Sequence, residues 1–381
     1  MIKIIASALF IFVIAGCWNR HEVDSIAIIM GIGLDKPEDS ENVRFTAQLF
    51  KPVEQKEGGR DGGGGEVTYW NIKSSGETVS TAIQSGIHKV PRELYFAHNQ
   101  IVIFGQNLAK KGIQPYIDFF VREHSNRLTV QVLVARNQAE EILDTPAHLE
   151  KMPSLDIMDL IESQAEASQS GTVNLKQMLT RLMSSTTAPI APLIEVIGQG
   201  SEETVRLSGT AVFKKDKLIG QLNQSETRGM LWVLGKVRRG TVEVACPEDD
   251  GKAALITTHS ESKVVPIVER GKVRINIHVK EEGIQGSQSC PENLATPPKN
   301  KQLEELKADA IREEMMKAVE KAQKLNADIF GFGEAVHRKY PRQWIELESD
   351  WDNIFPDIDV ALTVETKIRN QGRASKPIAE E

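Results

Sequence analysis

The chain has 381 residues, of which 40% are hydrophobic and 26% charged, and its 46 Lys and Arg against 53 Asp and Glu give a formal net charge of −7. Its length predicts two or three domains. The net negative charge and an aromatic content of only 6% argue against a nucleic-acid-binding surface. The negative charge also gives no electrostatic attraction to anionic lipids, so attachment to a membrane would need another means.

The N-terminus has the pattern of an export signal. Lys3 precedes an apolar run from Ile4 to Ala15, which has signal-peptide length and is short for a membrane span. Gly16 and Cys17 follow, and small residues directly before a cysteine resemble the lipobox of bacterial lipoproteins. We therefore expect residues 1–16 to be a lipoprotein signal peptide; the alternative is an ordinary signal peptide with a chance cysteine.

The lipobox resemblance implies a covalent lipid on Cys17. The lipid is a diacylglyceryl group on sulfur, with or without N-acylation, and the peptide is cut directly before the cysteine. Each buried methylene contributes about 0.8 kcal/mol, so one fatty chain binds a bilayer marginally and two or more on one residue bind it stably. Cys17 would then hold the protein at a membrane without a spanning helix.

The N-terminal region, residues 17–190, mixes strand and helix patterns. We expect strands at 26–34, 43–50, 67–72, 101–104 and 128–135, and helices at 78–90, 108–121 and from 138. A polar, glycine-rich stretch from Glu54 to Glu66 reads as a surface loop. The mixture favours an α+β fold with mixed, mostly antiparallel sheets packed against helices.

Residues 153–190 have a different pattern. Weak helical segments around 155–162 and 175–183 predict a helical connector, which either belongs to the N-terminal region or forms a separate lobe. The composition around 184–192, SSTTAPIAP, then indicates a linker at 191–204 and a domain boundary near 190–204.

The C-terminal region, residues 205–371, reads as a second α+β domain. We expect a hairpin over 207–220, a helix over 225–234, four strands between 241 and 279, and a loop over 291–301. Apolar residues at helical spacing from Leu303 to Leu325 predict a long amphipathic helix. A strand over 360–368 completes the domain, and the polar tail 372–381 is expected to be disordered.

A search for catalytic and ligand-binding motifs argues against an enzyme. The sequence has no H-E-x-x-H or G-x-S-x-G pattern, and three cysteines are too few for a cysteine-based zinc site. Ser260 and Lys263 fit S-x-x-K, but they lie between strand-like segments instead of at a helix start. We expect no catalytic residue, no metal site and no cofactor apart from the lipid.

Two further sets of residues leave alternatives open. Cys246 and Cys290 could form a disulfide if the chain is exported, or remain two thiols. Trp344, Trp351 and Phe355 lie near prolines in the block 328–356. They either fill the core at a helix-to-helix corner or form a contact surface for a partner subunit.

Four blocks in order give the chain a specific resemblance to the Ger(x)C family of spore germination proteins. The blocks are residues 16–35, beginning GCWNRHEV; 92–100, RELYFAHNQ, with the R-x-L-Y-x-x-H pattern; 208–213, SGTAVF; and 328–356, with DIFGFGE, YP and two tryptophans. They cover nearly the whole chain. The glycine-rich insert at 58–65 departs from the family and looks like a lengthened loop.

The resemblance implies a non-enzymatic role. Family members are three-domain α+β lipoproteins that serve as the C subunits of nutrient germinant receptors. They lie on the outer face of the spore inner membrane with two integral membrane subunits, A and B. The first hypothesis is therefore a lipid-anchored receptor subunit. The alternative is an extracytoplasmic lipoprotein that binds the nutrient itself, which predicts a deep cleft between two lobes. Neither the nutrient nor direct contact with it can be inferred.

Overall fold

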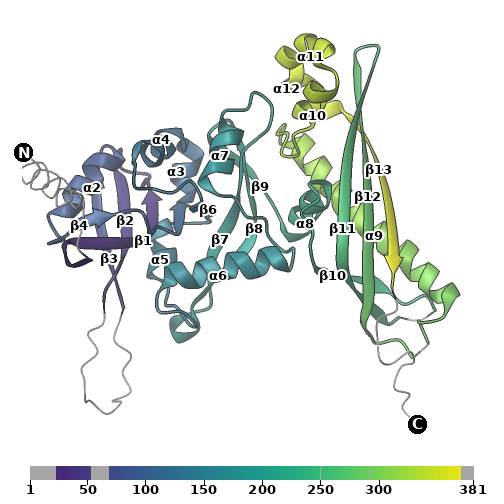
Figure 1. Ribbon diagram of the computed structural model, residues 1–381, viewed down its shortest axis with the longest axis horizontal. Coiled ribbons are helices and arrows are strands. Elements are labelled where there is room, and N and C mark those ends of the chain that lie inside the picture. Colours follow the sequence, from purple (N-terminus) through teal and green to yellow (C-terminus); the bar gives the residue numbers. More distant parts are fainter. Residues whose placement is uncertain (1–22, 53–67, 249, 292, 370–381) are drawn as a thin grey trace, which may run out of the picture.

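The computed structural model describes residues 23–52, 68–248, 250–291 and 293–369. The expected signal peptide, Cys17, the glycine-rich stretch and the C-terminal tail lie outside the described residues. Two units, each a sheet with helices, lie side by side along the long axis (Figure 1). The mixed, multi-domain α+β class predicted from the sequence is confirmed.

Nine strands of the described chain form the first sheet, in the order β3-β2-β1-β5-β6-β7-β8-β9, with β4 paired to β1. They are β1 (Ile26–Asp35), β2 (Val43–Phe50), β3 (Tyr69–Gly76), β4 (Glu93–Tyr95), β5 (Ile101–Phe104), β6 (Gln131–Ala135), β7 (Ile190–Ile197), β8 (Thr204–Lys214) and β9 (Lys217–Leu222). The two ends of the sheet are antiparallel, whereas β1, β5, β6 and β7 at its centre run parallel to one another.

The parallel centre differs from the mostly antiparallel pairing expected for the N-terminal half. Helices α3 (Gln106–Lys111) and α4 (Gln114–Arg122) connect β5 to β6. Helices α5 (Ala139–Asp144), α6 (Pro153–Glu166) and α7 (Leu175–Leu182) connect β6 to β7. A crossover of this length returns the chain to the same end of the sheet, so the next strand runs parallel.

The linker predicted at 191–204 is wrong for its first half. Residues 191–197 belong to β7, which pairs with β6 on one side and β8 on the other. Leu193 and Ile194 are buried in the core. Their burial stabilises this segment as a strand, although the neighbouring Ala and Pro are residues typical of a linker. The two helices expected in the connector are present as α6 and α7.

One helix expected over 108–121 is instead two, α3 and α4. Gly112 lies between them with φ +127°, a backbone conformation that side chains of L-residues rarely adopt. The break turns α4 so that Ile117 and Phe120 are buried against the sheet. Helix α2 (Val79–Ile87) matches the expected helix, and the Thr78 hydroxyl caps it by accepting a bond from the Thr81 amide.

The second sheet has the order β10-β11-β12-β13. Its strands are β10 (Gly240–Ala245), β11 (Lys252–Glu269), β12 (Lys272–Gln288) and β13 (Asp359–Ile368), and its helices are α8 (Gln224–Val233), α9 (Pro297–Lys324), α10 (Phe332–Lys339), α11 (Pro341–Leu347) and α12 (Trp351–Ile354). The two strands expected within 253–268 are one continuous strand, β11. Figure 1 shows α9 running along this sheet.

The amphipathic helix predicted over 303–325 is confirmed as α9, which begins six residues earlier, at Pro297. Proline suits the first helical position because its fixed φ fits the helix and its missing N–H would have no partner there. Part of the expected loop 291–301 is therefore the first turn of α9. The buried face of α9 includes Leu303, Ile311 and Met315.

The two units meet where the segment after α7 packs on the segment after α9. Asp328 is buried, and its carboxylate accepts bonds from the amides of Gly331, Phe332 and Gly333. Arg181 donates from Nη1 to the carbonyl oxygens of Ala188 and Ile329, at 2.7 and 3.0 Å. One hydrophobic cluster then continues from β1 to β13.

Candidate interaction site

An open, largely apolar groove lies beside the start of the described chain. It has a volume of about 790 Å³ and is lined by residues of α2, of the segment between Val90 and Phe96, and of the C-terminal part of α4 and the residue after it, together with Ser25. We call it the α2–α4 groove. In Figure 1, α2 and β4 lie on the side of the first unit that faces away from the second unit.

The R-x-L-Y-x-x-H segment forms one wall of the groove, and its buried and exposed side chains differ in character. Leu94 and Phe96 are buried and point their apolar side chains inward, whereas Arg92 and Glu93 are exposed at the rim. Phe96 contacts Phe119 of α4 edge to face, with ring centroids 6.1 Å apart. The segment therefore supplies an apolar wall with charged groups at its edge.

Helix α2 supplies the opposite wall. Ile83 is 8% exposed and packs on the core, while Ile87, one turn later, is 45% exposed. Residues four apart lie on the same helix face, so the two isoleucines form an apolar strip that leads from the core to the surface. Ser80 lies on the groove side of the same helix and is exposed.

Cys17, the predicted lipid site, lies outside the described residues. Ser25, eight residues later in the sequence, lines the α2–α4 groove. The distance between the groove and Cys17 is therefore limited by the length of the eight-residue stretch that joins Cys17 to Ser25.

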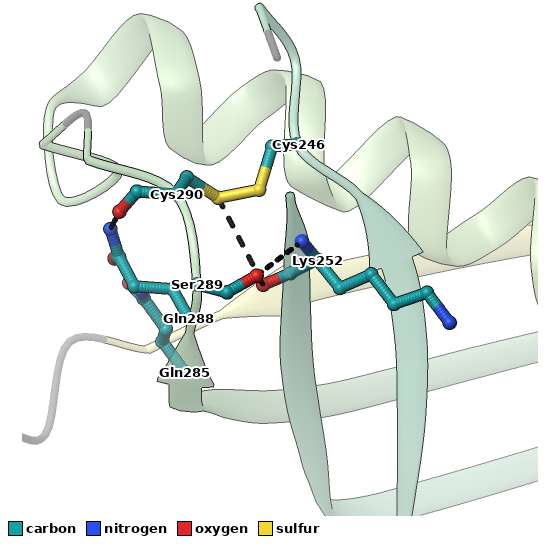
Figure 2. Close-up of a disulfide and its surroundings, with 6 residues drawn as sticks. All are labelled: Cys246, Lys252, Gln285, Gln288, Ser289 and Cys290. Atoms are coloured by element: carbon teal, nitrogen blue, oxygen red, sulfur yellow. Dashed lines mark hydrogen bonds between the residues drawn. A yellow bond between two sulfur atoms is a disulfide. The ribbon is translucent and has the colours of Figure 1, made fainter. Parts of the chain in front are cut away.

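Cys246 and Cys290 form a disulfide, with Cα atoms 6.2 Å apart (Figure 2). It joins the end of β10 to the segment between β12 and α9. Around it, the Lys252 amide donates to Ser289 Oγ at 2.9 Å, and Gln288 Nε2 donates to the Cys290 carbonyl at 2.8 Å. The alternative of two free thiols is therefore wrong.

The aromatic residues considered as a partner contact are in the core. Trp344 and Trp351 are each 3% exposed and Phe355 is 1% exposed. The two indole rings meet edge to face at 5.2 Å, and Trp351 lies 6.4 Å from Phe355. A buried side chain offers no surface to a partner, so the contact-surface alternative is wrong for these three residues and the core-filling corner is confirmed.

Two buried carboxylates of the described chain have raised pKa values with structural causes. Burial raises the pKa of Asp328, although bonds from three backbone amides oppose the shift. Burial likewise raises the pKa of Asp35, whose carboxylate accepts bonds from the amides of Ala139 and Glu140 at the start of α5. Both carboxylates therefore cap backbone amides.

A buried ion pair joins α9 to the second sheet. Lys307 Nζ lies 2.6 Å from Glu281 Oε1 of β12, and neither side chain is exposed. Near it, Arg228 of α8 pairs with Glu314 of α9, and Trp232 Nε1 donates to Glu314 Oε2 at 3.2 Å. The first pair joins α9 to the sheet out of contact with solvent, and the second joins α8 to α9 at a partly exposed position.

Other features of the described residues bear on ligand binding. They contain no group of three or more His, Cys, Asp or Glu placed to hold a metal ion. A second hollow, of about 1090 Å³, lies at the β11–β12 turn, where Arg274 pairs with Asp359 at 2.7 Å. This hollow and the α2–α4 groove are each lined by one unit, whereas the nutrient-binding alternative predicted a cleft between two lobes.

Within the described ranges, no helix is both long enough and apolar enough to cross a bilayer.

The signal for the groove was present in the sequence but incomplete. Val79, Ala82, Ile83 and Ile87 were recognisable as the apolar face of a helix. Ile87 extends that apolar face beyond the part that the core covers. An apolar helix face longer than the core it packs on was therefore the feature of the sequence that indicated a groove. The approach of Phe119 to Phe96 joins residues 23 positions apart, and no local pattern predicts it.

Two family models match successive parts of the chain. "Spore germination protein N-terminal domain" matches residues 19–196, and "Spore germination B3/ GerAC like, C-terminal" matches residues 208–372. The interval between them, residues 197–207, runs from the end of β7 into the start of β8, inside the first sheet.

Curated proteins and a solved structure are also similar. Spore germination protein KC of Bacillus subtilis (strain 168) is 28% identical over 97% of this chain and 95% of its own length. Spore germination protein B3 of the same organism is 23% identical over 97% and 98%. The crystal structure of the GerBC protein aligns with a TM-score of 0.57 and 17% identity over 89% of this chain and 97% of that chain, which supports the fold.

Proposed function

Because the chain belongs to the Ger(x)C family of spore germination proteins, we propose that it is the C subunit of a nutrient germinant receptor. It would act with two integral membrane subunits, A and B, and without catalysing a reaction. The observation that carries the proposal is the succession of two spore germination family models along residues 19–196 and 208–372.

The proposed location is the outer face of the spore inner membrane, with fatty chains such as palmitate on Cys17 as the anchor. The lipobox pattern before Cys17 supports it. The Cys246–Cys290 disulfide supports it independently, because structural disulfides form and persist mainly in exported proteins. An exported body without a spanning helix among its described residues would depend on the lipid to stay at the membrane.

A non-enzymatic role agrees with where the perturbed groups lie. The buried carboxylate of Asp328 holds backbone amides, and Lys307 and Glu281 hold each other in the core. A catalytic pair would instead face a cleft that admits a substrate. The protein would therefore work by contact with its neighbours and by transmitting their conformational changes.

The anchor is tested with Cys17→Ala in sporulating cells. The variant should leave the membrane fraction while its thermal unfolding midpoint stays unchanged, because Cys17 precedes the folded body. Mass spectrometry of the mature N-terminus should find a lipid-modified cysteine as the first residue. Retention of Cys17→Ala on membranes that lack the partner subunits would contradict the lipid anchor.

The receptor assignment is tested by isolating the wild-type chain from spore membranes. It should co-purify with two integral membrane proteins, and deleting it should abolish germination in response to a nutrient. A thermal-shift screen of the purified chain against amino acids, sugars and nucleosides tests the alternative. A stabilisation that follows ligand concentration would favour direct nutrient capture.

A further inference from the structure

We propose that the α2–α4 groove receives an amphipathic helix that an integral membrane protein presents at the bilayer surface. This inference rests on the proposed function, because it takes the chain to be anchored through Cys17. It adds to that function a surface and the kind of partner segment that binds there.

The length of the tether limits where the groove can be. Eight residues separate Cys17 from Ser25, which lines the groove. An extended chain spans at most about 3.6 Å per residue, so Ser25 lies within about 30 Å of the lipid-modified cysteine. That is roughly the thickness of one bilayer core, so the groove stays close to segments that emerge from the membrane.

The shape of the groove favours a helix over the bilayer itself. A planar bilayer cannot enter a concave surface, whereas a helix about 10 Å across can place one face in it. The groove is open to solvent, so it suits an occupant that buries one face and leaves the rest of its surface exposed. Apolar anchors spaced three or four residues apart are the usual content of such a groove.

The chemistry of the groove leads to the same occupant. Its floor is apolar, with Ile83, Leu94 and Phe96 buried below an exposed Ile87. Its rim carries Arg92, Glu93 and Glu123, charges of both signs. Anionic lipid headgroups bind clusters of cations, which this rim does not offer. A helix with an apolar face and mixed charges beside it matches both floor and rim.

Site-specific photocrosslinking in native spore membranes tests the proposal. A photoreactive phenylalanine analogue is placed at Ser80, exposed on the groove side of α2, in a chain that keeps Cys17. The matched control carries the same analogue at Ile345, which is 77% exposed on α11 in the other unit. Ser80 should crosslink to an integral membrane protein, and Ile345 should not crosslink to the same segment.

The identity of the crosslinked peptide is part of the result. Mass spectrometry should map it to a segment at the end of a membrane span, with apolar residues at helical spacing. Ile87→Asp in the same chain should reduce the crosslink at least tenfold, because a carboxylate would then have to be desolvated in the groove. Ile345→Asp should leave the crosslink unchanged.

Three results would overturn the proposal: crosslinks from Ser80 to lipid alone, crosslinks to a water-soluble protein, or a crosslink that Ile87→Asp does not weaken. A separate readout distinguishes this failure from failure of the proposed function. If the wild-type chain were absent from the membrane fraction, the anchor would be wrong as well. If it were present and co-purified with two membrane subunits, only the groove assignment would fall.

Discussion

Lys307 Nζ and Glu281 Oε1 lie 2.6 Å apart in a space that excludes solvent from both side chains. Burial raises the pKa of Glu281 and lowers the pKa of Lys307, because each charged form has lost its hydration. Their mutual attraction opposes both shifts. The pair therefore holds α9 against β12, and either residue alone would be a charge buried without a counter-ion.

Lys307→Met should lower the free energy of unfolding by about 3–5 kcal/mol, because it leaves the Glu281 carboxylate buried and unpaired. Replacing both residues with Met should recover most of the loss. Urea denaturation measures both variants. Lys317→Met, an exposed position on the same helix, should change the unfolding free energy little. A loss in the double variant as large as in the single one would contradict this account.

The instability of Lys307→Met should depend on pH. In this variant the Lys307 charge no longer opposes the effect of burial, so the pKa of Glu281 in the folded state lies further above its ordinary value of 4.5. A group with a raised folded-state pKa stabilises the protein below its unfolded pKa and loses that contribution as pH rises through the folded pKa. The variant should therefore gain stability relative to wild type as pH falls through the raised folded-state pKa toward the ordinary value of 4.5. Urea denaturation across this range checks it, and a constant difference would be inconsistent.

The Cys246–Cys290 disulfide should stabilise the C-terminal unit. Its cysteines are 44 residues apart in sequence, and the loop-entropy relation gives about 4 kcal/mol for a closed loop of that length. The double variant Cys246→Ser, Cys290→Ser should lose roughly this amount in denaturant unfolding. Reductant should bring the wild type to the same value and leave the variant unaffected.

Trp351→Ala should destabilise the protein by about 3–5 kcal/mol through a cavity in the aromatic cluster. Ile345→Ala, 77% exposed on the neighbouring helix, should stay within about 0.5 kcal/mol of wild type. Thermal and urea unfolding compare the two. A Trp351→Ala variant with unchanged stability and lost binding to membrane subunits would restore the partner-contact interpretation.

Sequence patterns predicted the parts of the fold that depend on local periodicity. The apolar spacing from Leu303 to Leu325 identified α9 because one face of that helix is buried along its length. For the corner around Trp344 and Trp351 the sequence left two interpretations open, and burial of both side chains decides for the core-filling one.

Patterns failed where contacts distant in sequence decide the outcome. The Ala and Pro beside Leu193 are typical of a linker, yet β6 and β8 pair on either side and make the segment a strand. Lys307 lies in a helix full of lysines and glutamates, and nothing local distinguishes it from the solvated ones. Its partner Glu281 lies 26 residues earlier, so only the packing of α9 on the sheet brings the charges together.

Because β8 and β9 belong to the first sheet, they determine where the chain can be divided into recombinant fragments. The boundary suggested by the two family models would separate β7 from β8. A fragment that stops at residue 196 would expose the unpaired edge of a long apolar strand, which invites aggregation. A recombinant piece meant for antibodies or crystals should therefore continue past Leu222, where the β8–β9 hairpin ends.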